Sequence, residues 1–408
     1  METLPPLRTD IELVPARAGG REVIAISDPL EIVPEGAALA SEAVIYLPLF
    51  DGTATVSDLQ MEMMRRGGGG LVYRSEAERF ALELDRLGIL QTSAYRAARE
   101  QIVEKFAEQP ERPAVLAGKS YPEDPAVLSD WLDRIIAGPE DRTPADPSRG
   151  APCGLAAPHI DLRVAERTYG HAYRAIRAIA PSAVLLLGTG HALGGVRYCL
   201  TDKIFTTPLG RVPTDREAVA RIRTSASQAL CADDFPHRRE HSIEFQLLFL
   251  QRIFPMEETP VVPVLCGGME DLFGRVGSPA EDPGVAAFTG ALSAWLDTPP
   301  APKIVVAGID LSHVGPKFGD PESGRALEPE VRSGDGVLLE AFARGDADAL
   351  FAAAASGRNR YRVCGLSALW TLLAILPGTE GTVLDYGIHH EEPTRSAVSF
   401  CAAVLHRR

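Results

Sequence analysis

Histidines and an aspartate recur just beyond apolar runs in this chain. His159 follows the run CGLAAP, His191 follows AVLLLGTG, and Asp310 and His313 follow KIVVAGI. A further run, VVPVLC, ends in two glycines. In open α/β sheets, ligands bind just beyond the carboxyl ends of the strands. We therefore expect these side chains to face one crevice.

A metal site is the chemistry that several converging imidazoles indicate. A single histidine after a strand is commonly a hydrogen-bonded structural residue or a loop residue, but His159, His191 and His313 occur together. Distant segments can supply three ligands and leave open positions, as iron and catalytic zinc sites require. The spacing fits no short local zinc pattern such as CxxC or HExxH.

Another candidate histidine lies at the start of an expected apolar helix, REHSIEFQLLFLQRIF. Glu240, His241 and Glu244 fall in its first turn, and His241 and Glu244 share one face. Acidic residues there complement the helix dipole, which explains the glutamates but not the histidine. We expect His241 to belong to the site, and Glu244 is a possible supporting partner.

Cys364 precedes Gly365 and the apolar run LSALWTLLAIL, so its sulfur is expected near a helix N-terminus, where the thiolate is favoured. The neighbouring Arg360 and Arg362 favour a functional role. The alternative is a small buried hydrophobic residue. That alternative is preferred for the cysteines in strand-like runs, Cys199, Cys266 and Cys401.

Proton transfer is the second chemistry that this pattern allows. Asp310 and His313 could form a carboxylate and a general acid or base at the end of one strand. Asp310 could also simply cap the following turn. Tyr386, His389 and His390 lie in or before the sequence HHEEPT, which is typical of a surface loop.

The elements that must position these residues are strands alternating with helices. From Leu116 onward, an amphipathic helix that starts at an Asp-Pro pair is followed by apolar strands and helical stretches up to the C-terminus. This alternation predicts an α/β domain with a mostly parallel central sheet flanked by helices. A Pro-, Asp- and Gly-rich loop is expected over 138–152.

A small N-terminal domain is expected over 1–105, followed by a polar linker at 106–114 and the α/β domain at 115–408. Residues 31–92 predict two or three short helices, with a turn at 51–53, a helix start at 55–58 and a helix over 77–87. The phrase LPLFDGTATVSDL resembles small winged-helix domains of the PqqD-like kind, which hold peptides. The N-terminal domain is therefore expected to be mainly helical or winged-helix.

Composition excludes several classes of partner. Among the 408 residues, Asp and Glu number 55 and Lys and Arg 41, which gives a net charge of −14. This balance argues against nucleic acid and anionic membranes as partners. Neither a signal peptide nor a membrane-spanning run is evident, so a cytoplasmic location is expected. The six scattered cysteines do not resemble a secreted disulfide framework.

The order of motifs resembles the Memo family, whose prokaryotic members are called AmmeMemoRadiSam system protein B. The motifs are APHIDLR, LLGTGH, TPLGRVPTD, REHSIEFQL, VPVLCGG, DLSHVG and VCG before an apolar helix. They cover roughly 115–408, and the first hundred residues lie outside the resemblance. The family in turn resembles the type III extradiol dioxygenases, which are non-haem iron enzymes with an α/β fold.

The resemblance also implies roles for individual residues. His159 in APH, His191 in GTGH and Cys364 in VCG match its metal-ligand positions. The residues that match the surround of the metal are Asp310, His313 and His241. The dioxygenases have a carboxylate where this chain has Cys364, and a thiolate suits a softer or redox-active metal. Residues 160–163 also depart from the family pattern, so the substrate is not carried over.

Two hypotheses of function follow. The first is a metalloprotein, with iron(II) preferred over copper or zinc, that carries out redox or oxygenase chemistry on an unknown small substrate. The second is a non-catalytic module that handles metal or binds a partner, such as a peptide or a radical-SAM protein. Metal content and partner binding after deletion of 1–105 distinguish the two.

Overall fold

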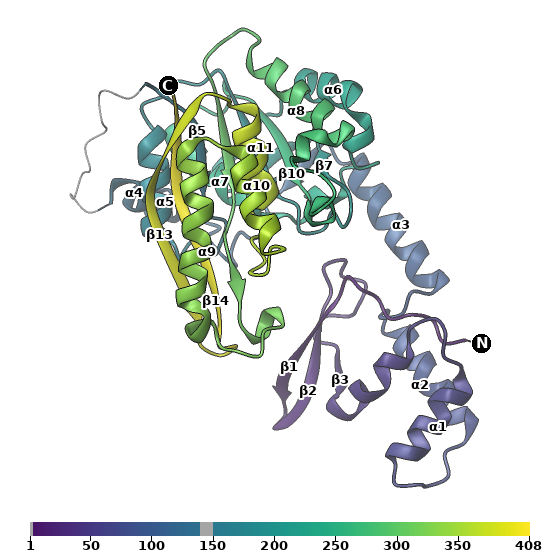
Figure 1. Ribbon diagram of the computed structural model, residues 1–408. Helices are drawn as coiled ribbons and strands as arrows, with labels where there is room; N and C mark the ends of the chain where they lie inside the picture. Colours follow the sequence, from purple (N-terminus) through teal and green to yellow (C-terminus); the bar gives the residue numbers. More distant parts are fainter. Residues whose placement is uncertain (1–2, 139–149) are drawn as a thin grey trace. The chain divides into compact units, whose positions relative to one another are not determined.

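The computed structural model describes residues 3–138 and 150–408, which form two compact units, Met1–Glu108 and Gln109–Arg408 (Figure 1). Most of the loop expected over 138–152 lies outside the described residues. Among the described helices, none is both long and apolar enough to cross a membrane.

The smaller unit combines a short antiparallel sheet with helices. Its sheet, in the order β1-β2-β3, was not expected from the sequence, whereas the helices largely were. The helix that begins after Thr55 has a capping box, because Thr55 and Asp58 bond to each other's backbone N–H groups. The elements are β1 (Glu12–Ala18), β2 (Arg21–Ser27), β3 (Ala38–Ala40), the 3₁₀ helix η1 (Ser41–Leu49), α1 (Val56–Arg66), α2 (Arg74–Arg86) and α3 (Ser93–Glu108).

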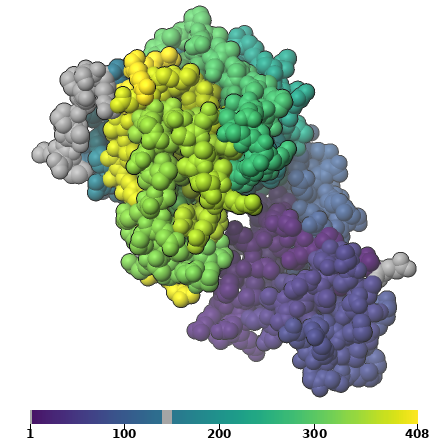
Figure 2. Space-filling view, in the orientation of Figure 1, coloured from purple at the N-terminus to yellow at the C-terminus, as the bar shows by residue number. Residues whose placement is uncertain are grey.

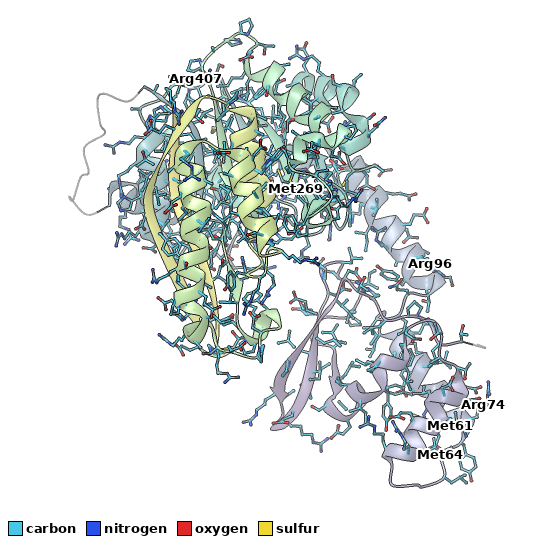
Figure 3. The ribbon with its side chains drawn as sticks, viewed as in Figure 1. Met61, Met64, Arg74, Arg96, Met269 and Arg407 are labelled. Atoms are coloured by element: carbon cyan, nitrogen blue, oxygen red, sulfur yellow. The ribbon has the colours of Figure 1, made fainter. Side chains whose placement is uncertain are left out.

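This unit has a hydrophobic core of its own, which includes Leu4, Leu47, Leu59 and Leu84. It also exposes large apolar side chains. Met61 is 56% exposed and Leu71 is 74% exposed. Figure 3 marks Met61 on α1 and Arg74 at the start of α2.

The larger unit is built on one eight-stranded sheet in the order β12-β14-β5-β11-β6-β10-β7, with β13 paired to β14. Its central strands β5, β11, β6 and β10 are parallel. Antiparallel strands flank this parallel centre. The strands are β5 (Pro152–Ala157), β6 (Ala183–Thr189), β7 (Tyr198–Leu200), β10 (Val261–Cys266), β11 (Lys303–Gly308), β12 (His313–Val314), β13 (Thr379–Glu391) and β14 (Ser396–Arg407).

Helices cover both faces of this sheet, which confirms the α/β fold class. Val184 and Leu186 of β6 pack in one core with α4, α5 and α7. Leu185 and Leu187 point to the other face and pack with α6, α8, α9, α10 and α11. The helices are α4 (Pro125–Ala137), α5 (Glu166–Ile176), α6 (Arg216–Ser225), α7 (His241–Ile253), α8 (Pro283–Leu296), α9 (Gly324–Arg344), α10 (Ala347–Ser356) and α11 (Leu366–Ile375). In Figure 2, residues coloured green to yellow, from the later part of the chain, form most of the visible face of this unit.

Two stretches differ from what the sequence indicated. Residues 106–114, expected to be a linker, contain the end of α3 and strand β4 (Glu111–Pro113). That strand pairs with β8 (Ile204–Thr207), which in turn pairs with β9 (Gly210–Val212). Tyr386, His389 and His390, expected in a surface loop, lie within β13 and are partly buried. Tyr386 and His390, on the same face of β13, contact Asp335 and Glu328 of α9. The polar sequence HHEEPT gave no sign of these contacts.

Candidate metal centre

The register of the parallel strands places several candidate residues at one edge of the sheet. Ala157 of β5 and Gly188 of β6 both pair with Gly308, the last residue of β11. His159 and Asp310 each lie two residues beyond this row of paired residues, and His191 lies three residues beyond it. Two neighbouring strand ends thus deliver the first histidine and the aspartate to the same point.

His159 is oriented by the end of the neighbouring strand. Its Nδ1 lies 3.1 Å from the carbonyl oxygen of Gly308, and only 2% of the residue is exposed. Because a carbonyl can only accept, Nδ1 carries the hydrogen and Nε2 keeps its lone pair. Burial lowers the pKa of His159 well below its ordinary value, and the charges of His191 and His241 lower it further. The ring is neutral, as a metal ligand must be.

His191 is oriented by a carboxylate. Its Nδ1 lies 3.0 Å from Oε2 of Glu240, which also accepts the backbone N–H of His191 at 3.3 Å. Burial opposes protonation of His191, but hydrogen bonds to Cys364 and Glu240 outweigh it and raise the pKa to about 10. Since 41% of the side chain is exposed, solvent screens part of this effect. The proton would have to leave before a metal could bind.

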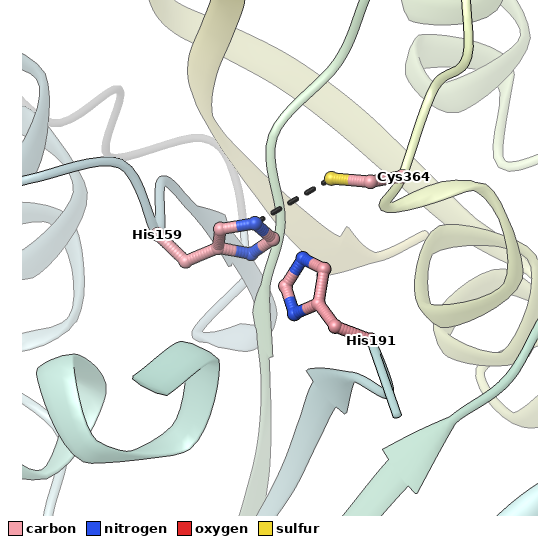
Figure 4. Close-up of side chains that lie close together, drawn as sticks. All are labelled: His159, His191 and Cys364. Atoms are coloured by element: carbon pink, nitrogen blue, oxygen red, sulfur yellow. Dashed lines mark hydrogen bonds between the residues drawn. The ribbon is translucent and has the colours of Figure 1, made fainter. Parts of the chain in front are cut away.

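Cys364 completes a group of three donors. Its Sγ lies 3.4 Å from Nε2 of His159, the contact drawn in Figure 4, and 3.6 Å from the carbonyl oxygen of Asp310. Burial raises the pKa of the Cys364 thiol, although a hydrogen bond to His191 opposes that rise. The thiolate expected from the nearby helix α11 is therefore not favoured in the protein without a metal.

The arrangement fits a metal ion. One nitrogen of each histidine and the sulfur of Cys364 all lie within 4.8 Å of one another. Metal–nitrogen bonds near 2.1 Å and a metal–sulfur bond near 2.3 Å put tetrahedral ligands about 3.6 Å apart. The separation of 3.4 Å between His159 and Cys364 is close to that value. His191, Glu240 and His241 form a second group within the same limit, so a carboxylate competes for His191.

His241 and Asp310 lie directly beside these donors. The ring of His241 stacks on His191 at a centroid distance of 5.0 Å and meets His159 edge-on at 5.2 Å. Burial lowers the pKa of His241, so this ring is neutral at neutral pH. The Asp310 carboxylate accepts the backbone N–H of His159 at 3.1 Å and lies 3.5 Å from its Nε2. Burial raises the pKa of Asp310 to about 7.

His313 is held apart from Asp310. Its Nδ1 lies 3.0 Å from the carbonyl oxygen of Leu311, and its ring packs edge-on against Phe318 at 5.1 Å. Burial lowers the pKa of His313 to about 4, and the charge of His191 contributes. Within 3–138 and 150–408, no hydrogen bond joins His313 to the Asp310 carboxylate. The Asp310 carboxylate instead faces His159, and the proton-transfer roles expected of Asp310 and His313 stay predictions.

Glu244 points away from the candidate ligands. Its carboxylate pairs with Arg112, accepts from the hydroxyl of Tyr121, and accepts backbone N–H groups of Val115 and Leu116. The supporting carboxylate is instead Glu240, the N-cap residue of α7. The sequence offered one sign of this role. Glu240 directly precedes His241, and a favourable interaction with the helix dipole would explain the glutamate but not the histidine.

Arg112 and Asp335 support the site but carried no sequence signal. Arg112 donates to the carbonyl oxygens of His237 at 3.1 Å and Glu240 at 2.6 Å, and so fixes the backbone that enters α7. Asp335 on α9 accepts from the hydroxyls of Ser312, Ser399 and Tyr386. These bonds hold the segment that joins Asp310 to His313.

Comparison with known proteins identifies the family of the chain. A family described as Memo-like protein matches residues 112–404. The chain is 30% identical to a MEMO1 family protein of Aquifex aeolicus over 393 residues, which cover 95% of each chain. It is 31% identical to one of Thermus thermophilus over 353 residues, 86% of this chain and 99% of that protein. Since 95% of the chain is covered, the Aquifex match includes most of the smaller unit, which the sequence resemblance had left outside.

Proposed function

The chain belongs to the Memo family, and on that premise we propose that it binds one metal ion through His159, His191 and Cys364. The observation that carries this proposal is that three donor atoms from three separate segments lie within 4.8 Å of one another. In each histidine, Nδ1 is also held by an acceptor, so Nε2 is the nitrogen available for a bond to the metal.

Iron(II) is the ion we propose, with copper and zinc as the competitors. Two imidazoles and one thiolate are suitable ligands for all three ions. With only three protein ligands, coordination positions on the ion stay open for other molecules. When bound, iron(II) would supply a Lewis acid and a redox centre at which dioxygen or a substrate could bind. We propose oxidation of a small substrate as the reaction class.

The surrounding residues would handle protons. His241 is neutral and 35% exposed, so it can accept a proton from a substrate bound beside the ligands. Asp310, with its pKa of about 7, can hold or release a proton next to Nε2 of His159. Glu240 would accept the Nδ1–H of His191, make that ring a stronger ligand and keep it in one orientation.

Elemental analysis of anaerobically purified protein tests metal binding. We expect about one ion per chain, and loss of that ion in the double variant His159→Ala/His191→Ala. The double variant His171→Ala/His406→Ala is the matched control, because both residues belong to the same unit but lie outside the cluster. Full occupancy in the first variant would rule out the assigned ligands.

Turnover requires a separate measurement. Oxygen uptake by the iron-loaded protein is followed with catechols and thiols as trial substrates, and Cys364→Ser is compared with wild type. We expect uptake that depends on substrate and on Cys364. Tight metal binding without uptake would reduce the proposal to metal handling.

A further inference from the structure

A pair of cysteines outside the candidate metal centre lies in a geometry suited to a disulfide. Tyr198 of β7 forms a parallel bridge with Leu230, and the backbone N–H of Cys231 donates to the carbonyl oxygen of Tyr198 at 2.9 Å. In a parallel register the next residues, Cys199 and Cys231, lie opposite each other on one face. Each of the two side chains is close enough to alter the pKa of the other thiol.

The backbone spacing fits the covalent bond. Paired strands lie about 4.7–4.9 Å apart, whereas a disulfide requires Cα atoms roughly 4.4–6.8 Å apart. The surroundings also hold both partners in place. The thiol of Cys199 donates to the carbonyl oxygen of Asp233 at 3.4 Å, and Nε2 of His237 lies 3.1 Å from the carbonyl oxygen of Cys199.

The two thiols differ in access and in acidity. Cys199 is fully buried, whereas Cys231 is partly exposed. The neighbouring Cys199 thiol lowers the pKa of Cys231, and the nearness of Cys231 together with burial raises the pKa of Cys199. Cys231 is therefore the thiol that an oxidant reaches first and the better nucleophile.

We propose that Cys199 and Cys231 form a reversible disulfide when the protein meets hydrogen peroxide. The Cys231 thiolate attacks one peroxide oxygen, breaks the O–O bond and becomes a sulfenic acid, while the other oxygen leaves as water after protonation. The Cys199 thiol then attacks the Cys231 sulfur, and the sulfenic oxygen leaves as a second water. Two thiols lose two electrons and two protons, and one peroxide is reduced to two waters.

This disulfide would restrain the segment that leads into the candidate metal centre. Cys231 begins the stretch that ends at Glu240, the carboxylate partner of His191. The proposal stands without the proposed metal site, because it rests on the thiol pair and the strand register alone.

Tryptic mapping of the full-length protein after treatment with hydrogen peroxide tests the proposal. Cleavage after arginine and lysine places Cys199 in peptide 198–203 and Cys231 in peptide 224–238. We expect these peptides to be recovered as one linked species, two hydrogens lighter than their sum, that dithiothreitol separates. The linked species should be absent from Cys231→Ser and retained in Cys153→Ser, the matched control from a buried strand.

The native fold should accelerate the reaction. We expect the linked peptide to form roughly tenfold or more faster in native protein than in urea-unfolded protein, because the fold holds the thiols together. This comparison uses wild type, so it does not depend on the folding of a variant. Reduced Cys199 and Cys231 after peroxide has oxidised other thiols would overturn the proposal. So would oxidation of Cys231 to a sulfinic acid without a link.

Discussion

The two candidate histidine ligands are fixed by different acceptors, and this difference has consequences at the level of single residues. His159 donates to a backbone carbonyl, which no side-chain substitution removes. His191 donates to Glu240, whose pKa stays low because the interactions with His191 and His241 outweigh the burial that opposes ionisation. A variant at Glu240 can therefore weaken one ligand and leave the other intact.

Replacing Glu240 with Gln should weaken metal binding without abolishing it. The neutral amide keeps a hydrogen-bond acceptor but loses the charge that makes His191 a stronger ligand. We expect affinity to fall by about 10- to 100-fold, measured by competition with a chelator of known affinity. Glu257→Gln, at an exposed position after α7, is the control. Equal affinities in both variants would show that Glu240 does not act on the ligand.

The Glu244–Arg112 pair should make stability depend on pH. Burial opposes ionisation of Glu244, but Arg112 and the hydrogen bonds from Tyr121 and Val115 outweigh it and hold its pKa below the ordinary 4.5. Between the pKa of Glu244 in the folded protein and 4.5, the unfolded chain therefore binds more protons than the folded chain. The stabilisation is therefore complete above about pH 5 and is lost as pH falls through the folded pKa.

Glu244→Gln tests this dependence. We expect a loss of about 3 kcal/mol at neutral pH, because Arg112 would stay buried without its counter-charge. The free energy of unfolding, measured by urea denaturation, should also fall less steeply with acid in the variant than in wild type. Parallel pH profiles for the two proteins would show that another carboxylate is responsible.

At the scale of elements, the approach of α7 to the strand ends decides whether the site forms. The hydroxyl of Ser242 donates to the carbonyl oxygen of Thr189 at the end of β6. The side chain of Gln246 donates to the carbonyl oxygen of Pro158 just beyond β5. These contacts require the helix to lie almost against the sheet, and Gly308 permits it. A Cβ at Gly308 would lie 2.3 Å from the carbonyl oxygen of Ser242.

Gly308→Ala should therefore displace α7 or destabilise the fold. We expect a cost of about 1–3 kcal/mol and weaker metal binding, because the Gly308 carbonyl also holds His159. Gly290→Ala in α8 is the matched control, since a Cβ there meets no atom within 4 Å. That variant should gain up to about 1 kcal/mol of stability. Similar unfolding curves for both variants would contradict the proposed close approach.

At the scale of the whole molecule, the cores are separate. The core of the smaller unit is formed by residues between Leu4 and Leu90, and those of the larger unit by residues from Tyr121 onward. All six candidate site residues lie in the larger unit. Each unit should thus be able to fold on its own hydrophobic burial.

Separate expression of 1–108 and 109–408 checks this independence. We expect each part to unfold cooperatively by calorimetry, and 109–408 to bind metal with an affinity within about threefold of the full chain. Removing the smaller unit should leave the affinity almost unchanged, because distant and independent parts of a protein contribute separately to its free energy. Loss of metal from 109–408, with its fold intact by circular dichroism, would show that the smaller unit contributes to the site.

Sequence patterns determined the parallel core of the sheet because each strand is a short apolar run followed by polar residues. The runs before His159, His191 and Asp310 became β5, β6 and β11. The helix starts at Thr55 and Glu240 were also visible, since caps are local interactions. The same local reasoning failed for His389 and His390, which belong to β13 and pair with β14 across the turn that follows Glu391. It also missed β1–β3, whose stability depends on packing against helices later in the chain.

Which residues meet was decided only by the tertiary structure. The sequence placed His159, His191, His241, His313, Asp310 and Cys364 near one edge, but it could not set distances between segments up to about 200 residues apart. The fold directs the Asp310 carboxylate to His159, and it makes Glu240, not Glu244, the carboxylate that supports the site, through His191. Both choices depend on strand register and on the seating of α7 against Gly308, which are long-range packing effects. Local spacing specifies the direction of a side chain, whereas packing specifies what it contacts.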